Sequence, residues 1–129
     1  MPRLKAPRRR SSILWVFFGL SGRISRGVYW LAYAFLMSLN SVLIGQLIGG
    51  EEASYFRMAQ AIAPALVLAT LVSNLAVSVK RLHDVDYSGY FALALLVPLV
   101  NLAFTIWVGI LPGKAGPNRF GTTPDAPPA

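Results

Sequence analysis

The stretch Met58–Val79, MAQAIAPALVLATLVSNLAVSV, contains no charged residue and decides the fold class. As an α-helix it would be about 33 Å long at about 1.5 Å per residue, which matches a hydrocarbon core of about 30 Å. Since lipid offers the backbone no hydrogen-bonding partners, an uncharged segment of this length has to pair its backbone groups internally, as a helix does. The stretch therefore predicts a transmembrane helix.

Two further uncharged runs of the same length lie on either side of this stretch. They are Val28–Gly49, VYWLAYAFLMSLNSVLIGQLIG, and Tyr90–Leu111, YFALALLVPLVNLAFTIWVGIL. Across the chain of 129 residues, 55% are hydrophobic and 13% are charged, and the charged share is roughly half that of a soluble domain. These features predict an all-α fold, a small polytopic membrane helix bundle with about three transmembrane helices.

The third run contains Pro98 and Asn101 near its middle. Proline removes a backbone donor and disrupts the preceding helical turn, so two arrangements are open. A kinked but continuous span is favoured, because each arm of a re-entrant hairpin would be only about two or three turns long. A hairpin would instead return the C-terminal tail, residues 112–129, to the side from which the run starts. The proline, glycine and threonine content of this tail indicates an extended and mostly unpacked segment.

A short apolar run, ILWVFFGL, occupies residues 13–20 after a basic N-terminal tail of residues 1–12. The run is too short to span a bilayer. It has the length of a signal-peptide core, or it forms a helix that lies in the headgroup layer with its aromatic residues at the apolar boundary. The interfacial helix is favoured, because the next run already serves as the insertion signal. The membrane domain is then expected to cover residues 13–111.

The positions of the basic residues predict the orientation of the chain. The loop between the first two runs carries Glu51, Glu52 and the single Arg57, whereas basic residues gather at the opposite ends of both runs. By the positive-inside rule, the N-terminus is expected in the cytoplasm and the protein in the plasma membrane. The net charge of +7 lies beside apolar runs, which favours anionic lipid headgroups over nucleic acid as the partner.

The segment Val79–Tyr90, VKRLHDVDYSGY, is the most polar part of the apolar region. Helix-end chemistry explains much of it, since cations suit a helix C-terminus and Ser88 or Asp86 can cap the next helix. Its charges also alternate with apolar residues, as in a half-buried turn, and we expect basic residues before the first run to pair with its carboxylates. We term the charged and polar residues of this segment, together with their expected partners, the collar. If the tail returns, its motif NRFG adds Asn118 and Arg119 to the collar. The collar consists of Arg23, Arg26, Arg81, His83, Asp84, Asp86, Asn118 and Arg119.

Asn40 and Asn101 are the strongest polar markers inside the apolar runs. Both fall near the middle of the membrane, where an unpaired amide costs on the order of several kcal/mol. We expect them to bond to each other or to a partner helix. No acidic or basic residue lies within any of the three runs, which argues against an ion-coupled carrier.

The collar contains too few ligand-type residues to indicate a metal site or a catalytic site. The chain has one histidine and no cysteine, and a His-Asp pair alone is a weak signal for either. We therefore expect no cofactor, no metal and no enzymatic activity, with His83 as a hydrogen-bonding member of the collar. The leading hypothesis is a membrane protein that binds a partner protein or anionic lipid through the collar. The alternatives are an oligomeric channel or transporter subunit and, less favoured, an enzyme or metal site centred on His83.

Four motifs occur along the chain in a fixed order. They are GRISRGVYW (Gly22–Trp30), KRLHDVDYSGY (Lys80–Tyr90), LVPLVN (Leu96–Asn101) and GKAGPNRFGTTP (Gly113–Pro124). Together they resemble the bacterial inner-membrane family known as domain of unknown function 805, over the chain from about Phe18 to Pro124. The chain departs from the family pattern with Lys80 for Arg, Tyr90 for Trp and Asn101 for Gly. The last difference weighs against a tight hairpin tip. The resemblance implies a compact membrane protein with no assigned reaction.

Overall fold

A computed structural model describes residues 12–49 and 54–128 of the chain. The elements are α1 (Ile13–Phe18), α2 (Arg26–Gly49), α3 (Ser54–Asp84), the 3-10 helix η1 (Gly89–Leu96) and α4 (Pro98–Ile110). Within these described ranges the only β structure is two isolated bridges. The predicted all-α fold class is therefore confirmed. Most of the basic N-terminal tail, together with Glu51 and Glu52, lies outside the described residues.

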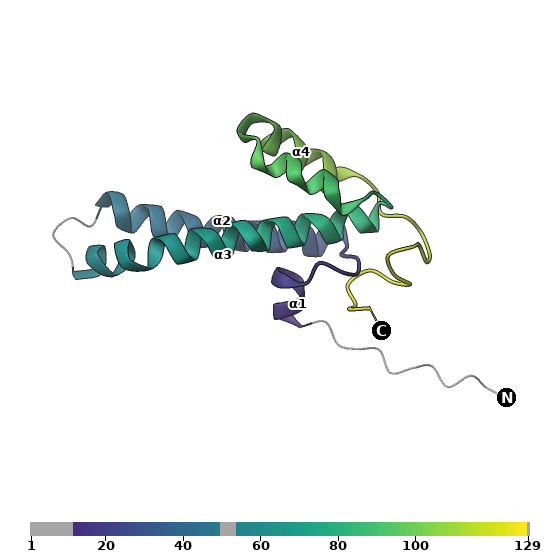
Figure 1. Cartoon of the computed structure of the whole chain (residues 1–129), viewed down its shortest axis with the longest axis horizontal. Coiled ribbons are helices and arrows are strands. Elements are labelled where there is room, and N and C mark those ends of the chain that lie inside the picture. Colours follow the sequence, from purple (N-terminus) through teal and green to yellow (C-terminus); the bar gives the residue numbers. More distant parts are fainter. Residues whose placement is uncertain (1–11, 50–53, 129) are drawn as a thin grey trace.

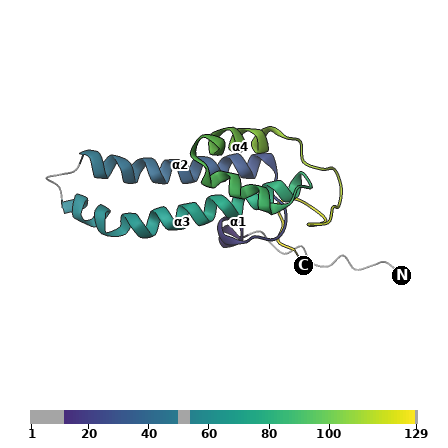
Figure 2. The same ribbon diagram turned by 45° about the horizontal axis from the view of Figure 1, so that its top comes forward.

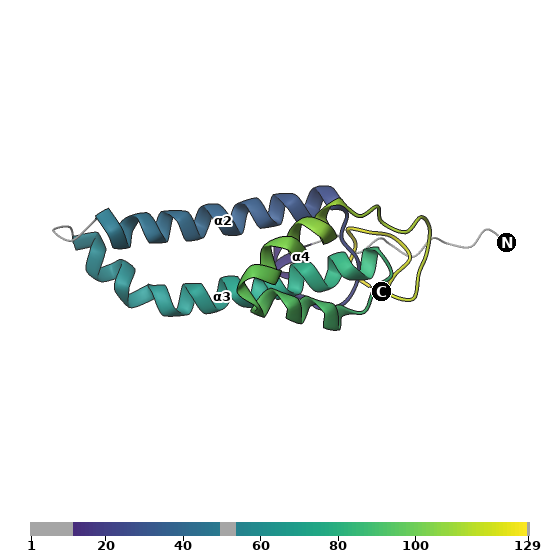
Figure 3. The same ribbon diagram turned by 90° about the horizontal axis from the view of Figure 1, so that it is seen from above.

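Helices α2 and α3 form a long antiparallel pair (Figures 1 and 3). Each is long and apolar enough to cross a membrane. Helix α3 continues past Val79, where the predicted helix ends, as far as Asp84. This extension takes Lys80 and Arg81 into the protein, where both residues are fully buried. They are therefore not solvent-exposed cations at a helix end.

The third apolar run is two helices, and the favoured prediction of one kinked helix is wrong. Helix η1 ends at Leu96, and Pro98 begins α4, at a helix position where the missing N–H of proline breaks no hydrogen bond. The two helices lie together on one side of the α2–α3 pair, and α1 lies on the other side (Figure 1). The run thus turns back on itself as a helical hairpin.

Asn101 stabilises the turn of this hairpin. Its Nδ2 donates to the carbonyl oxygen of Leu95 at 2.8 Å, and its backbone N–H donates to the carbonyl oxygen of Val97 at 2.8 Å. A side-chain amide can donate a hydrogen bond to a carbonyl oxygen that has lost its partner where a helix is broken. Glycine has no side chain to do this. The asparagine therefore favours the hairpin, contrary to the expectation from sequence.

Of the two predicted alternatives, a bond between Asn40 and Asn101 is not present among the described residues, and each asparagine bonds to a neighbouring helix instead. Asn40 Nδ2 donates to the carbonyl oxygen of Leu36 in its own helix at 2.8 Å. Across the helix pair, Asn40 Oδ1 accepts a long hydrogen bond of 3.5 Å from Thr70 of α3. Each asparagine thus serves a local structure, and Asn40 also links α2 to α3.

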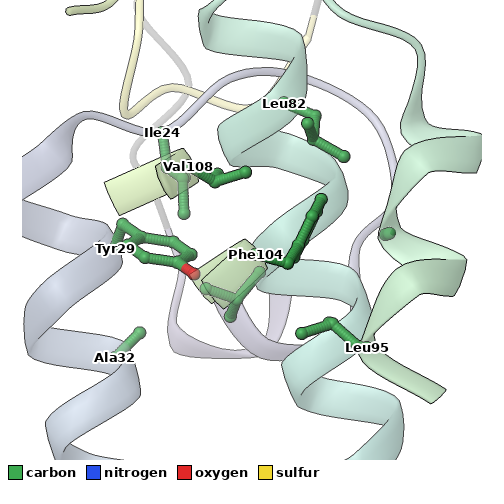
Figure 4. Close-up of a cluster of buried hydrophobic side chains, with 9 residues drawn as sticks. Ile24, Tyr29, Ala32, Leu82, Leu95, Phe104 and Val108 are labelled. Atoms are coloured by element: carbon green, nitrogen blue, oxygen red, sulfur yellow. The ribbon is translucent and has the colours of Figure 1, made fainter. Parts of the chain in front are cut away.

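The hydrophobic core lies where α2, α3, η1 and α4 meet (Figure 4). Figure 4 shows side chains from these helices pointing toward one another, with Tyr29 and Phe104 near its centre. Further along α2, toward the loop, a Cβ added to Gly45 or Gly49 would meet no other part of the described chain within 4 Å. Lipid is as apolar as leucine, so packing and polar contacts, more than exclusion from lipid, hold membrane helices together. Several side-chain hydrogen bonds between distant parts of the chain lie beside this core, in the collar.

Candidate functional site

Asp84, the last residue of α3, lies at the centre of a buried charge cluster. Its Oδ1 accepts a hydrogen bond from Arg23 Nε at 3.1 Å, and its Oδ2 accepts one from Arg81 Nη1 at 2.5 Å. The side chain of Asp84 is 5% exposed, and those of Arg23 and Arg81 are 1% and 0% exposed. The sequence predicted that Arg23 would meet Asp84, and the structure contains this pair. A buried ion is costly unless it is paired and hydrogen-bonded, so the three side chains depend on one another.

Arg23 uses its other N–H groups to hold the C-terminal tail. Its Nη1 donates to the carbonyl oxygens of Gly116 at 2.7 Å and Gly121 at 3.3 Å, and its Nη2 donates to that of Lys114 at 2.6 Å. The tail therefore returns to the end of the molecule where α2 begins (Figure 2). The expectation of a mostly unpacked tail is wrong, because its backbone carbonyls satisfy a buried guanidinium.

The tail passes so close to Asp84 that only glycine fits at position 113. A Cβ placed on Gly113 would overlap the Asp84 carboxylate. In the next residue, the Lys114 N–H donates to the carbonyl oxygen of Asp84 at 2.8 Å. Backbone and carboxylate of one aspartate thus organise the start of the tail.

Arg81 caps the C-terminal end of α4. Its Nε donates to the carbonyl oxygen of Val108 at 3.2 Å, and its Nη2 donates to that of Leu111. Carbonyls in the last turn of a helix lack partners within the helix and carry partial negative charge. The guanidinium groups of Arg23 and Arg81 share the single carboxylate of Asp84, so positive charge exceeds negative charge in this cluster. The partial negative charge at the end of α4 balances part of that excess.

Lys80 caps the C-terminal end of α1, the short helix that precedes α2 in the sequence. Its Nζ donates to the carbonyl oxygens of Trp15 at 2.9 Å, Val16 at 2.7 Å and Gly19. The ammonium group also lies 5.3 Å from the centre of the Trp15 ring, within range of a cation–π contact. Lys80 was outside the predicted collar, since its partners are backbone oxygens that no side-chain pattern reveals.

His83 is buried and held on two sides. Its Nδ1 lies 3.0 Å from the carbonyl oxygen of Gly22, and its ring stacks on that of Phe120 at 3.9 Å between centroids, with the planes 6° apart. Gly22 has φ +95°, a backbone conformation that favours glycine. Asn118 Nδ2 donates to the backbone carbonyl oxygen of His83 at 2.8 Å. The tail motif thus joins the collar through contacts with His83.

Asp86 forms a second, exposed charge group at the rim of the collar. Its Oδ2 accepts from Lys114 Nζ at 2.9 Å, and its Oδ1 lies 3.5 Å from Arg119 Nε. The hydrogen bond from Lys114 lowers the pKa of the Asp86 carboxyl, and the charges of Lys114 and Arg119 act in the same direction. Burial opposes this shift. The sequence placed Asp86 in the collar, but the structure pairs it with the tail and not with the residues before α2.

Asp125 closes the tail onto the beginning of α2. Its Oδ1 accepts from the Ser25 N–H at 2.7 Å, and its own N–H donates to the carbonyl oxygen of Arg23 at 2.8 Å. A carboxylate at a helix N-terminus is stabilised by the free N–H groups there. Asp125 was outside the predicted collar, because its position depends on the return of the tail.

Arg26 differs from the other predicted members of the collar. It is exposed as the first residue of α2, and within residues 12–49 and 54–128 no ion pair involves it. The expected pairing of Arg26 with a collar carboxylate is therefore wrong, because Arg23 and Arg81 already occupy Asp84. Over the same ranges, no group of three or more metal-ligating side chains is placed to hold an ion.

The two long apolar helices and the internal charge cluster define a small helical membrane protein. Residues 17–122 match the family described as "Protein of unknown function (DUF805)", and the chain belongs to this family. Inner membrane protein YhaI of Escherichia coli (strain K12) is 34% identical over 115 residues, covering 88% of this chain and 92% of the relative. Inner membrane protein YhaH of the same strain is 30% identical over 125 residues, covering 87% and 92%. No solved structure matches the chain.

Proposed function

We propose that this chain is a non-enzymatic, multi-pass inner-membrane protein that binds anionic lipid headgroups at its collar end. In this proposal α2 and α3 span the bilayer, and the N-terminus lies in the cytoplasm. The names of the relatives support the membrane, and the basic residues of the collar support the orientation.

The observation that carries the proposal is an unbalanced positive charge at the collar end. The described residues there include six basic side chains, Arg23, Arg26, Lys80, Arg81, Lys114 and Arg119, and three acidic ones, Asp84, Asp86 and Asp125. Each acidic side chain is already engaged within the protein. The surplus cations can therefore attract negative groups from outside, and lipid phosphates are the nearest source beside an apolar helix pair.

The available cations lie at the rim of the collar. Arg23, Lys80 and Arg81 are buried with their donors engaged, whereas Arg26 is exposed at the beginning of α2. The side chains of Lys114 and Arg119 are 52% and 63% exposed. A headgroup that approaches α2 from the surrounding lipid meets Arg26 before any buried cation.

The test compares Arg26→Gln with Arg57→Gln, which removes an equally exposed arginine at the opposite end of the helix pair. Purified protein is equilibrated in nanodiscs of phosphatidylglycerol and phosphatidylcholine, and the lipids that remain bound are counted by native mass spectrometry. We expect Arg26→Gln to reduce the preference for the anionic lipid by about fivefold, since one basic residue contributes about 1 kcal/mol, and Arg57→Gln to leave it unchanged. Equal effects of the two substitutions, or no preference in the unsubstituted protein, would contradict the proposal.

A further inference from the structure

A hollow of about 410 Å³ lies beside the collar, between α3 and η1. Its walls are mainly apolar, with Leu75 and Val79 from α3 and Leu93 from η1, and Leu20 and Phe120 also line it. Pockets that bind small organic molecules have volumes of about 300–1,000 Å³, apolar walls and a few polar groups that orient the ligand. This hollow has those properties, and its polar groups define what it can bind.

The first polar group is the Nε2 atom of His83. Since a carbonyl oxygen can only accept, the contact of 3.0 Å with Gly22 requires the proton to be on Nδ1. In the neutral ring Nε2 is then a hydrogen-bond acceptor. A Cβ placed on Gly89, which lines the hollow, would lie 3.2 Å from Nε2. His83 is only 9% exposed, and among the described residues Nε2 has no hydrogen-bond partner.

The second polar group is the hydroxyl of Ser88, which precedes η1. Its oxygen accepts a long hydrogen bond of 3.4 Å from the Tyr90 N–H as the cap of that helix. A serine hydroxyl has one donor in addition to its acceptor sites, so the Ser88 O–H can donate to a ligand. The hollow thus combines one acceptor and one donor with a long apolar wall.

We propose that this hollow binds a membrane molecule with a long apolar chain and a neutral hydroxyl head. The hydroxyl donates to His83 Nε2 and accepts from the Ser88 O–H, and the chain lies along Leu75, Val79 and Leu93. An ionised carboxylate or phosphate has no proton to donate to Nε2. The stacked ring of Phe120 fixes the direction of Nε2, so the head is bound in one position. This site does not depend on lipid binding at Arg26.

The experiment uses three photoreactive probes with the same diazirine-bearing chain, namely hexadecanol, its methyl ether and hexadecanoic acid. Each is added to the full-length protein in phosphatidylcholine nanodiscs, and labelled residues are identified by mass spectrometry. We expect the alcohol to label residues of the hollow. We expect the ether, which cannot donate, to label them about fivefold less, as the loss of one hydrogen bond implies, and the ionised acid to behave like the ether.

Two substitutions test the position of the site. Leu20→Trp fills part of the hollow from an exposed position, and its control Leu14→Trp changes another exposed leucine, in α1 and outside the hollow. Only Leu20→Trp should abolish labelling by the alcohol. His83→Asn keeps a donor near Gly22 but removes the Nε2 acceptor, and it should make alcohol and ether equivalent.

The proposal is overturned if alcohol and ether label the hollow equally in the unsubstituted protein, since the hollow would then bind any acyl chain. It is also overturned if labelling spreads evenly over the lipid-facing surface, or if Leu14→Trp and Leu20→Trp have the same effect. The comparison of alcohol with ether needs no substituted protein, so it decides the matter even if His83→Asn fails to fold.

Discussion

Lys80 and Arg81 are consecutive residues of α3, yet each binds the C-terminal carbonyls of a different helix. Lys80 holds α1, and Arg81 holds α4. Successive side chains of a helix point about 100° apart, so one turn of α3 reaches neighbours on two of its sides. This pair of contacts explains why so much charge is concentrated in a short segment of an apolar chain.

The first prediction concerns the buried carboxylate. Asp84→Asn removes the negative charge shared by Arg23 and Arg81, and we expect it to lower the free energy of unfolding by about 3–5 kcal/mol. The matched control, Asp86→Asn, makes the same change in a carboxylate that is 31% exposed and paired with exposed cations, and should cost less than about 1 kcal/mol. Reversible unfolding in mixed micelles measures both values. Similar losses in the two variants would show that Asp84 is not the centre of the fold.

The second prediction concerns the attachment of α1. Lys80→Met removes the lysine donor from three carbonyl oxygens at the end of α1, of which only that of Trp15 keeps a bond from the Gly19 N–H among those described, and we expect α1 to separate from α3. Protease cleavage between Gly19 and Ser25 should then become faster, while α2 and α3 stay intact. The control is Lys114→Met, which removes a lysine that is 52% exposed in the tail. Unchanged cleavage in Lys80→Met would mean that packing alone holds α1.

The third prediction is an acid-dependent release of the tail. The pKa of Asp86 is lowered in the folded protein, so its contribution to stability is present above the unfolded pKa of about 3.9. This contribution is lost as the pH falls through the lower folded pKa. A spin label on Thr122→Cys, the only thiol in the chain, should become more mobile over this range.

The control for this measurement is Asp86→Asn in the same labelled protein. Without a carboxyl at position 86, the label should already be more mobile at neutral pH. The mobility of the label should also change less as the pH falls below the reference aspartate pKa of about 3.9. A pH profile identical to that of the parent would assign the transition to another group.

The fourth prediction is that both ends of the chain lie on the same side of the membrane. The tail bonds to Arg23 just before α2, so the proposed orientation places the residues before α2 and the tail in the cytoplasm. A fluorescent protein fused after Ala129 should therefore fold and fluoresce, and alkaline phosphatase fused there should be inactive. A phosphatase fusion at the loop between α2 and α3 should be active and serves as the control. An active phosphatase after Ala129 would require the third run to cross the membrane.

Much of the architecture could be predicted from charge and length alone. The uncharged runs identified α2 and α3, and the placement of arginines and aspartates identified Arg23, Arg81 and Asp84 as neighbours. Both inferences rest on the free-energy cost of leaving a backbone polar group or a charge unpaired inside a membrane.

Other features depend on contacts that residue types do not specify. Proline suits both a kinked helix and the first turn of a new one, so Pro98 alone could not distinguish a span from a hairpin. Arg23 and Arg26 are three residues apart, but α2 begins at Arg26, so the buried Arg23 lies in the segment before the helix. The tail lacks apolar periodicity because its backbone, more than its side chains, makes the contacts with Arg23.

The bonds between Arg23 and the tail also impose an order on biosynthesis. A ribosome releases Arg23 about a hundred residues before Gly121 and Asp125, and at about 5–20 residues per second the delay lasts several seconds. During that interval the guanidinium lacks its tail carbonyls and has to remain hydrated. The nascent chain can insert its first helices early, but it completes its charged interior only once the tail through Asp125 has left the ribosome.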